Sequence, residues 1–212
     1  MGFPAFFEHA PVVRVRDPLA ELLGAADDGI IEYRYADAVR LAGHSCPTVA
    51  GAFLMARAAL LALFPDELPQ RGSVAVRIPA PEDSGTTGVV AQVLTLLTGA
   101  AAENGFKGLG GRFARNGLLE FAAVESGSAI TFQRTDTGAS VSVDLDFASV
   151  PPDPAQRALL TAILQDRADA DQRKAFGAAW QDRVRRLLTE HANDAQVIRV
   201  RRHHADNSTG NN

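Results

Sequence analysis

The chain has 212 residues, of which 46% are apolar and 22% charged, and its net charge at pH 7 is −4. These values are ordinary for a globular protein, and the negative charge excludes a broad electrostatic attraction to nucleic acid. A chain of this length buries enough surface to fold without a disulfide or a structural metal, and its one cysteine permits no internal disulfide. We therefore expect a single domain over residues 1–202 and a disordered polar tail over residues 203–212.

The N-terminus lacks the basic start and apolar run of a secretory signal, so we expect a cytoplasmic protein. The most apolar stretch is residues 47–64, but Arg57 lies in its middle and alanine supplies much of its apolar count. This composition favours a buried core helix over a membrane span. We expect neither a membrane nor a nucleic acid as a partner.

Periodicity and stop signals predict an α+β fold, with two buried helices packed on a mostly antiparallel sheet and additional C-terminal helices. The two buried helices are residues 47–64, opened by a proline, and residues 86–98, which Gly99 ends. A glycine-rich, irregular segment follows over residues 99–117. Strands are expected at 12–15, 73–78, 118–124, 129–134, 140–146 and 196–201, and further helices at 19–26, 34–42, 155–168 and 171–191.

The segment Gly43-His44-Ser45-Cys46-Pro47 is the strongest functional signal in the chain. A histidine and a cysteine two residues apart can reach one metal ion from a single bend of the backbone, and thiolate with imidazole suits zinc. A thiol beside a helix N-terminus also experiences the positive end of the helix dipole, which favours the thiolate. We therefore predict Cys46 and His44 as metal ligands or as a catalytic pair.

The sequence signals for the other candidate ligand residues are weaker. His9 is the spare imidazole that could add a third metal ligand. Glu82 and Asp83 follow a predicted strand, where loops often carry function, and they suit either a ligand or a turn with a helix cap. Gln92 is the one amide in an apolar helix and must find a hydrogen-bond partner. Lys107 lies among glycines and suits an anionic ligand, although a plain mobile loop explains it equally well; the order of residues is not that of a nucleotide-binding P-loop.

The succession of these pieces resembles the FmdE family, proteins similar to one of the subunits of formylmethanofuran dehydrogenase. The resemblance covers roughly residues 35–165 and leaves residues 151–202 as a helical extension. It rests on Gly43-His44-Ser45-Cys46-Pro47, Glu82, Gln92-Val93-Leu94-Thr95, Thr98-Gly99 and Gly105-Phe106-Lys107-Gly108. It implies a metal site at the His-x-Cys bend, with zinc as the usual metal, and a homodimer.

The chain departs from the family pattern at several donor positions. Ala42 stands where the family has its first histidine, and Thr86 where its second helix has a cysteine. Val89 stands where that helix has an aspartate, and Ala100 or Ala101 where the next cysteine falls. The site is therefore either reduced or completed by another ligand.

Three functions remain open from the sequence. The first is a transition-metal site on His44 and Cys46 that binds a small molecule or activates water. The second is a metal-free enzyme in which Cys46 is the nucleophile and a histidine the base. The third is a non-catalytic dimeric binding or assembly module, which the loss of family donors favours.

Overall fold

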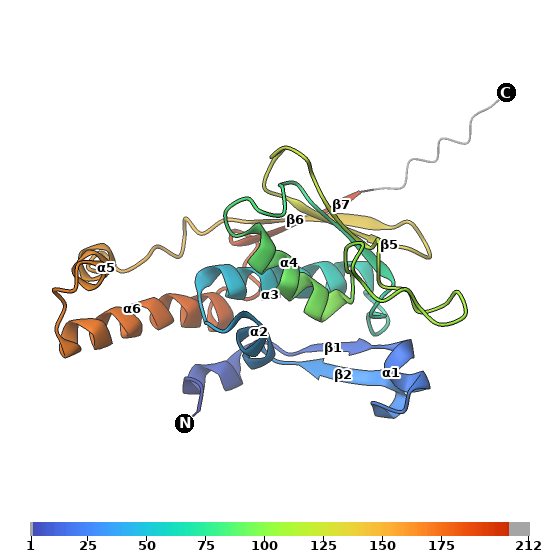
Figure 1. Cartoon of the computed structure of the whole chain (residues 1–212), viewed down its shortest axis with the longest axis horizontal. Helices are drawn as coiled ribbons and strands as arrows, with labels where there is room; N and C mark the ends of the chain where they lie inside the picture. The colour runs from blue at the N-terminus through green and yellow to red at the C-terminus, as the bar shows by residue number, and fades with distance from the viewer. Residues whose placement is uncertain (1, 204–212) are drawn as a thin grey trace.

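The structure is a computed structural model that describes residues 2–203 (Figure 1). Helices and a mostly antiparallel sheet are both present, which confirms the expected α+β class. The elements, in chain order, are η1 (Ala5–His9), β1 (Val13–Arg16), α1 (Pro18–Leu22), η2 (Asp27–Gly29), β2 (Ile30–Tyr33), α2 (Tyr35–Ala42), α3 (Pro47–Leu63), β3 (Val74–Ile78), α4 (Thr87–Thr98), β4 (Leu119–Phe121), β5 (Ile130–Arg134), β6 (Ser140–Leu145), α5 (Gln156–Leu164), α6 (Ala170–Thr189) and β7 (Ile198–His203).

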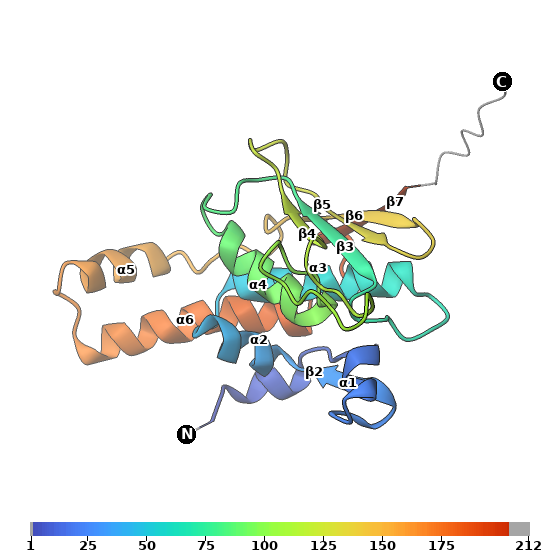
Figure 2. The same ribbon diagram turned by 45° about the vertical axis from the view of Figure 1, so that its right-hand side comes forward.

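The main sheet has the strand order β4-β3-β5-β6-β7 and forms one layer of the molecule (Figure 2). β3 and β4 run parallel, and the other neighbouring strands run antiparallel. Along β3 the residues Val74, Val76 and Ile78 are buried, whereas Arg77 on the opposite face pairs with Glu120 of β4. This alternation places one face of the sheet against the helices and leaves the other exposed.

Helix α3 lies across β5, β6 and β7 and is buried along most of its length, as its apolar composition predicts. The contact is close because Gly51 faces the sheet: a Cβ at this position would lie 2.3 Å from Cδ2 of Leu145. Helix α4 packs beside α3, and α2 packs on both. The two apolar helices and the inner face of the sheet together form the core.

Three local predictions differ from the structure. The sequence predicts no element at residues 30–33, but β2 pairs there with β1 in a separate two-stranded sheet. The first helix ends at Leu22 rather than residue 26, because Gly24 takes a φ of 66° that an α-helix does not allow. The sequence assigns His203 to the tail, but this residue ends β7, where its ring bonds the hydroxyl of Ser142. The rest of that tail, residues 204–212, lies outside the described residues.

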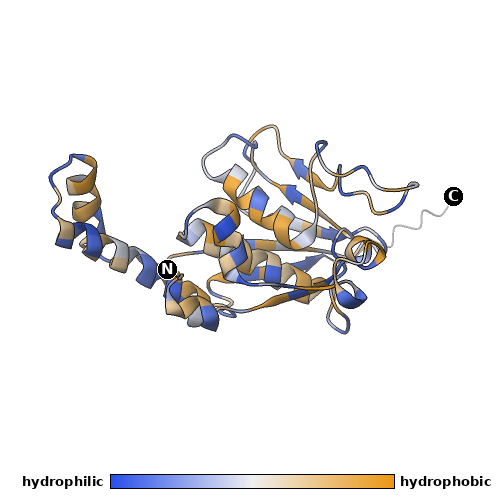
Figure 3. Ribbon diagram, turned by 60° about the horizontal axis from the view of Figure 1, so that its bottom comes forward, coloured by the Kyte–Doolittle hydropathy of each residue, from blue (hydrophilic) through white to orange (hydrophobic). Residues whose placement is uncertain are grey.

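Helices α5 and α6 form an arm that projects from one end of the molecule (Figure 1). The same arm stands apart in Figure 3, where polar and apolar residues alternate along it. The inner half of α6 packs on α3, and its Val184, Leu187 and Leu188 are buried. On α5, Leu160 and Leu164 remain exposed. Among the helices within residues 2–203, none is both long and apolar enough to cross a membrane.

A buried ion cluster fastens the glycine-rich segment to the rest of the fold. The carboxylate of Asp17 accepts hydrogen bonds from Arg71 Nη1 at 2.9 Å and from Arg115 Nη2 at 2.7 Å. The Arg71 guanidinium also donates to the carbonyl oxygens of Thr95 and Leu96, in the last turn of α4. One carboxylate thus links the start of α1, the segment before β3, the end of α4 and the glycine-rich loop.

Candidate functional site

The bend between α2 and α3 begins at a glycine that the backbone requires. Gly43 ends α2 with a φ of 74°, and its N–H donates to the carbonyl of Val39. The chain then turns through His44 and Ser45 into Cys46, which is the N-cap residue of α3, and Pro47 occupies the first helical position. The predicted helix start is therefore confirmed.

The cysteine sulfur is in the position of a helix-capping side chain. Cys46 Sγ accepts the N–H of Val49 at 3.4 Å, a bond that a serine or aspartate oxygen makes at most N-caps. The free N–H groups and dipole of the helix both interact favourably with negative charge on this sulfur. The residue is buried, with 8% of its surface exposed.

The imidazole of His44 lies against that sulfur in a defined tautomer. Its Nδ1 is 2.9 Å from the carbonyl oxygen of Ala42, and because a carbonyl can only accept, Nδ1 carries the proton. The lone pair of a neutral ring is then on Nε2, which lies 3.4 Å from Cys46 Sγ. The two side chains that the sequence singles out therefore meet, with the free nitrogen of one directed at the sulfur of the other.

Helix α6 holds the backbone of the bend from the far side. The carbonyl oxygen of Ser45 accepts Trp180 Nε1–H at 3.0 Å and the Gln181 side-chain amide at 3.1 Å. The Ser45 hydroxyl donates to Gln181 Oε1 at 2.9 Å and lies 3.0 Å from the hydroxyl of Tyr35. Because the Ser45 hydrogen is used for Gln181, Tyr35 is the donor in the second contact, and burial raises the pKa of Tyr35, which keeps its phenol protonated.

No sequence signal indicates these supporting residues. Gln181 lies 136 positions from Ser45, and no spacing within a single sequence reports such a contact. Trp180 is the only tryptophan of the chain, and a tryptophan that is partly buried usually finds an acceptor for its N–H. That rule could have suggested a polar partner, but it could not have identified Ser45.

The described residues bring no third metal donor to this pair. Within residues 2–203 there is no group of three histidine, cysteine, aspartate or glutamate side chains that could hold an ion. His9 is exposed in η1, which packs on α6, and it does not join His44 and Cys46 in such a group. The metal-ligating set that this part of the chain presents is one sulfur and one imidazole nitrogen.

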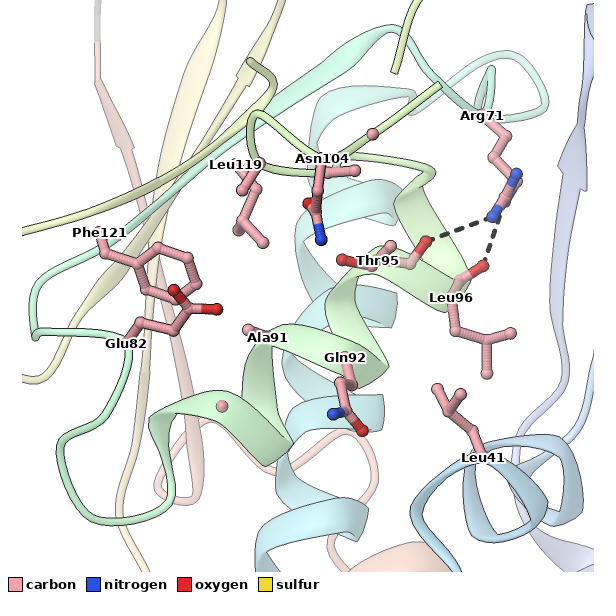
Figure 4. Close-up of a pocket in the computed structure, with 14 residues that line it drawn as sticks. Leu41, Arg71, Glu82, Ala91, Gln92, Thr95, Leu96, Asn104, Leu119 and Phe121 are labelled. Carbon is pink, nitrogen blue, oxygen red and sulfur yellow. Dashed lines mark hydrogen bonds between the residues drawn. The ribbon is translucent and has the colours of Figure 1, made fainter. Parts of the chain in front are cut away.

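A separate pocket of about 440 Å³ lies between α4, the glycine-rich loop and the end of α2 (Figure 4). Glu82 and Gln92, both predicted as ligand-binding residues, line it. Gln92 is exposed on α4 rather than enclosed by apolar neighbours, because that face of the helix borders the pocket. In Figure 4, Glu82 lies on one side and Arg71 on the other, with Asn104 reaching over α4 from the loop.

The other two predicted ligand-binding residues lie elsewhere. Asp83 and Lys107 are exposed and are not among the residues that line this pocket. The loop that carries Lys107 is tied down by backbone bonds, including Arg115 N–H to the Phe106 carbonyl at 2.7 Å. The glycines here therefore build a defined turn structure around the lysine.

Comparisons with known proteins provide no information on the function of this site. A scan of the chain against protein-family models finds no match, and a search of curated proteins finds no significant match.

Proposed function

We propose that the His44–Cys46 bend binds a transition metal, with zinc as the preferred ion, in a divergent protein of the FmdE type. The observation that carries this proposal is the contact between Cys46 Sγ and His44 Nε2 at 3.4 Å, with Nδ1 already bonded to a carbonyl. Metal-binding histidines commonly donate their second ring nitrogen to a carbonyl in this way, which fixes the tautomer and orients the ring.

The separation of the two donor atoms fits a shared ion. Zinc bonds thiolate sulfur at about 2.3 Å and imidazole nitrogen at about 2.0–2.1 Å, so two such ligands at a tetrahedral angle lie about 3.5 Å apart. The observed 3.4 Å is close to this value. Small rotations of both side chains would convert their mutual contact into joint coordination, without moving the backbone of the bend.

The remaining coordination positions must be filled from outside this pair. Catalytic zinc sites usually have three protein ligands and one open position, whereas the described residues supply two here. Water, a small molecule or a donor from a second copy of the chain would complete the shell. An ion with such open positions could polarise a bound ligand or activate water.

Cobalt titration of the full, untagged chain tests the proposal. One equivalent of Co²⁺ should produce the near-ultraviolet charge-transfer absorption of a cobalt–thiolate bond. Cys46→Ser should abolish this absorption, and His44→Gln should weaken the affinity. His191→Gln is the matched control, because His191 is paired with Asp194 at the far end of α6. The proposal fails if wild-type protein shows no thiolate absorption or if Cys46→Ser leaves it unchanged.

One further variant completes that experiment. His9→Gln tests the third predicted ligand, and a loss of affinity similar to that of His44→Gln would include it in the site. The tail histidine His204 is present in every variant, so any ion that it binds contributes an equal background.

A metal-free thiol site is the second candidate function. It is favoured by the Val49 N–H that bonds Cys46 Sγ at a helix N-terminus, because this contact stabilises a thiolate nucleophile without any metal. Rapid alkylation of Cys46 by iodoacetamide in metal-free buffer, slowed in His44→Gln, would support it. A sulfur that is inert and binds no cobalt would instead favour the non-catalytic assembly module.

A small-molecule ligand and a homodimer are the remaining parts of the proposal. The pocket lined by Glu82 and Gln92 provides opposite charges at its two sides, since Arg71 faces it from the other wall. The exposed Leu160 and Leu164 of α5 provide apolar surface that a second copy could cover. Light scattering during size-exclusion chromatography tests the dimer, and Leu164→Asn should reduce dimerisation if α5 contributes to it.

A further inference from the structure

A second cavity, distinct from the pocket of Glu82 and Gln92, lies beside the buried ion cluster. Its volume is about 410 Å³, and Pro18, residues 70–72 and residues 112–115 line it. Three of these residues are arginines, namely Arg71, Arg112 and Arg115, and none is acidic. A cavity lined by three arginines and no acidic residue attracts anions.

The carboxylate of Asp17 does not balance these charges by itself. Asp17 pairs with both Arg71 and Arg115, so it compensates one of their two positive charges. Its Oδ1 also accepts the backbone N–H groups of Leu19 and Ala20 at the start of α1. Arg112 forms no ion pair with any residue in the described range 2–203, and its guanidinium lies over the ring of Phe113. The cluster therefore retains a net charge of about +2 at the cavity.

Arg115 has unused hydrogen-bond donors and lines the same cavity. Its side chain is 9% exposed, and its Nη2 donates to Asp17. Its Nε and Nη1 donate no hydrogen bond within residues 2–203, and because that part of the chain has no fully buried side-chain polar atom without a partner, neither nitrogen is fully buried. Nη1 lies directly against Gly72, which also lines the cavity. Burial lowers the pKa of Arg115, so a bound anion would stabilise its charged form.

The loop holds the Arg115 guanidinium and the backbone of Arg112 in place. Arg115 lies directly on Gly72, where a Cβ would be 1.2 Å from Nη1, so only glycine permits this position. Arg112 closes a tight turn with Leu109, in which the two backbones exchange hydrogen bonds of 2.8 and 2.9 Å. The Arg115 donors are therefore positioned before any ligand arrives, which lowers the entropic cost of binding.

We propose that this cavity binds the phosphoryl group of a small molecule. Guanidinium groups match phosphate oxygens in a bidentate geometry, and several of them together favour a dianion. The cavity is larger than a phosphate ion, whose volume is similar to a few water molecules of about 30 Å³ each. It therefore has room for part of the organic group of a phosphate monoester.

Isothermal titration of the full chain at low ionic strength tests this inference, with inorganic phosphate and glycerol phosphate as separate probes. We expect saturable binding of both, and tighter binding of the ester if its organic group also enters the cavity. Equal affinities would assign the site to free phosphate. Arg112→Gln should weaken binding about tenfold, which corresponds to about 1.4 kcal/mol.

The control variant is Arg77→Gln, which removes an exposed arginine from the outer face of the sheet. Arg112 is exposed and donates no side-chain hydrogen bond within residues 2–203, so its replacement should leave the fold intact, and circular dichroism checks this. Binding that does not saturate at millimolar phosphate would overturn the inference. Equal weakening by Arg77→Gln and Arg112→Gln would also overturn it, because the attraction would then be a property of the whole surface.

Discussion

Replacing Asp17 by asparagine tests whether one carboxylate joins four parts of the fold. Asparagine has the same shape and is an equally good N-cap residue, so α1 keeps its first hydrogen bonds. The change removes the negative charge that Arg71 and Arg115 share, and it turns an amide N–H₂ toward one of the two guanidinium groups. The variant therefore isolates the buried charge pairing.

The expected loss of stability follows from burial. The side chains of Asp17 and Arg115 are 5% and 9% exposed, whereas that of Arg71 is 20% exposed and better solvated. Removing one partner of a buried ion pair costs about 3–5 kcal/mol, and partial solvation of Arg71 places this case near the lower end. A loss of about 3 kcal/mol would lower the melting temperature by about 6–12 °C in a chain of this length.

The dependence on pH provides a second signature. Burial alone would raise the pKa of Asp17, but the Arg71 hydrogen bond and the charge of Arg115 outweigh it, and the pKa in the folded chain lies below the usual value. The stability that its ionisation contributes is fully present above the unfolded pKa of about 3.9. It is lost as the pH falls through the lower, folded value. The difference between wild type and Asp17→Asn should thus be constant from neutral pH to about pH 5 and shrink below about pH 4.

Urea denaturation followed by far-ultraviolet circular dichroism measures both quantities. Arg77→Gln is the control, because it breaks an exposed ion pair with Glu120 that should contribute at most about 1 kcal/mol. If Asp17→Asn costs no more than this control, the cluster does not fasten the loop and the reasoning is refuted. A difference that persists unchanged at pH 3 would refute the electrostatic explanation in particular.

Three further variants test the core and the bend. Gly51→Ala should cost about 1–3 kcal/mol by overpacking, because its Cβ would lie 2.3 Å from Leu145; an unchanged urea midpoint would contradict this. Gly43→Ala should cost about 1 kcal/mol through its φ of 74° alone, since no atom lies within 4 Å of its Cβ, and a larger loss in thermal melts would reveal an unseen contact. Trp180→Phe removes one donor to the Ser45 carbonyl and should cost about 1 kcal/mol; if the bend depends on α6, it should also weaken cobalt binding, which the titration measures.

Local signals predict much of the fold because they act within a few residues. Pro47 and Gly99 mark a helix start and a helix end that both agree with the structure. β2 has only four residues and no clear alternation, so nothing local distinguishes it from a loop until β1 pairs with it. The ends of such short elements depend on tertiary partners rather than on propensity.

The sequence predicts only the central pair of the candidate site, His44 and Cys46. His44 and Cys46 are two positions apart, so sequence distance alone brings them together. Arg71 and Arg115 lie 54 and 98 positions from Asp17, and no periodicity or motif connects them. A single sequence can predict a site whose residues lie within one turn of backbone. It cannot predict an ion cluster whose residues come from distant segments.

The reliance of the bend on α6 has a consequence for how the chain can be shortened. The segment of roughly 35–165 that contains the sequence motifs ends before Trp180 and Gln181, the donors to the Ser45 carbonyl. It also ends before β7, so cutting there would strip β6 of its outer neighbour and expose its backbone N–H and C=O groups. A fragment chosen by motif alone would therefore keep Cys46 and His44. It would lose the part of α6 that holds their bend in position, and it would lose β7.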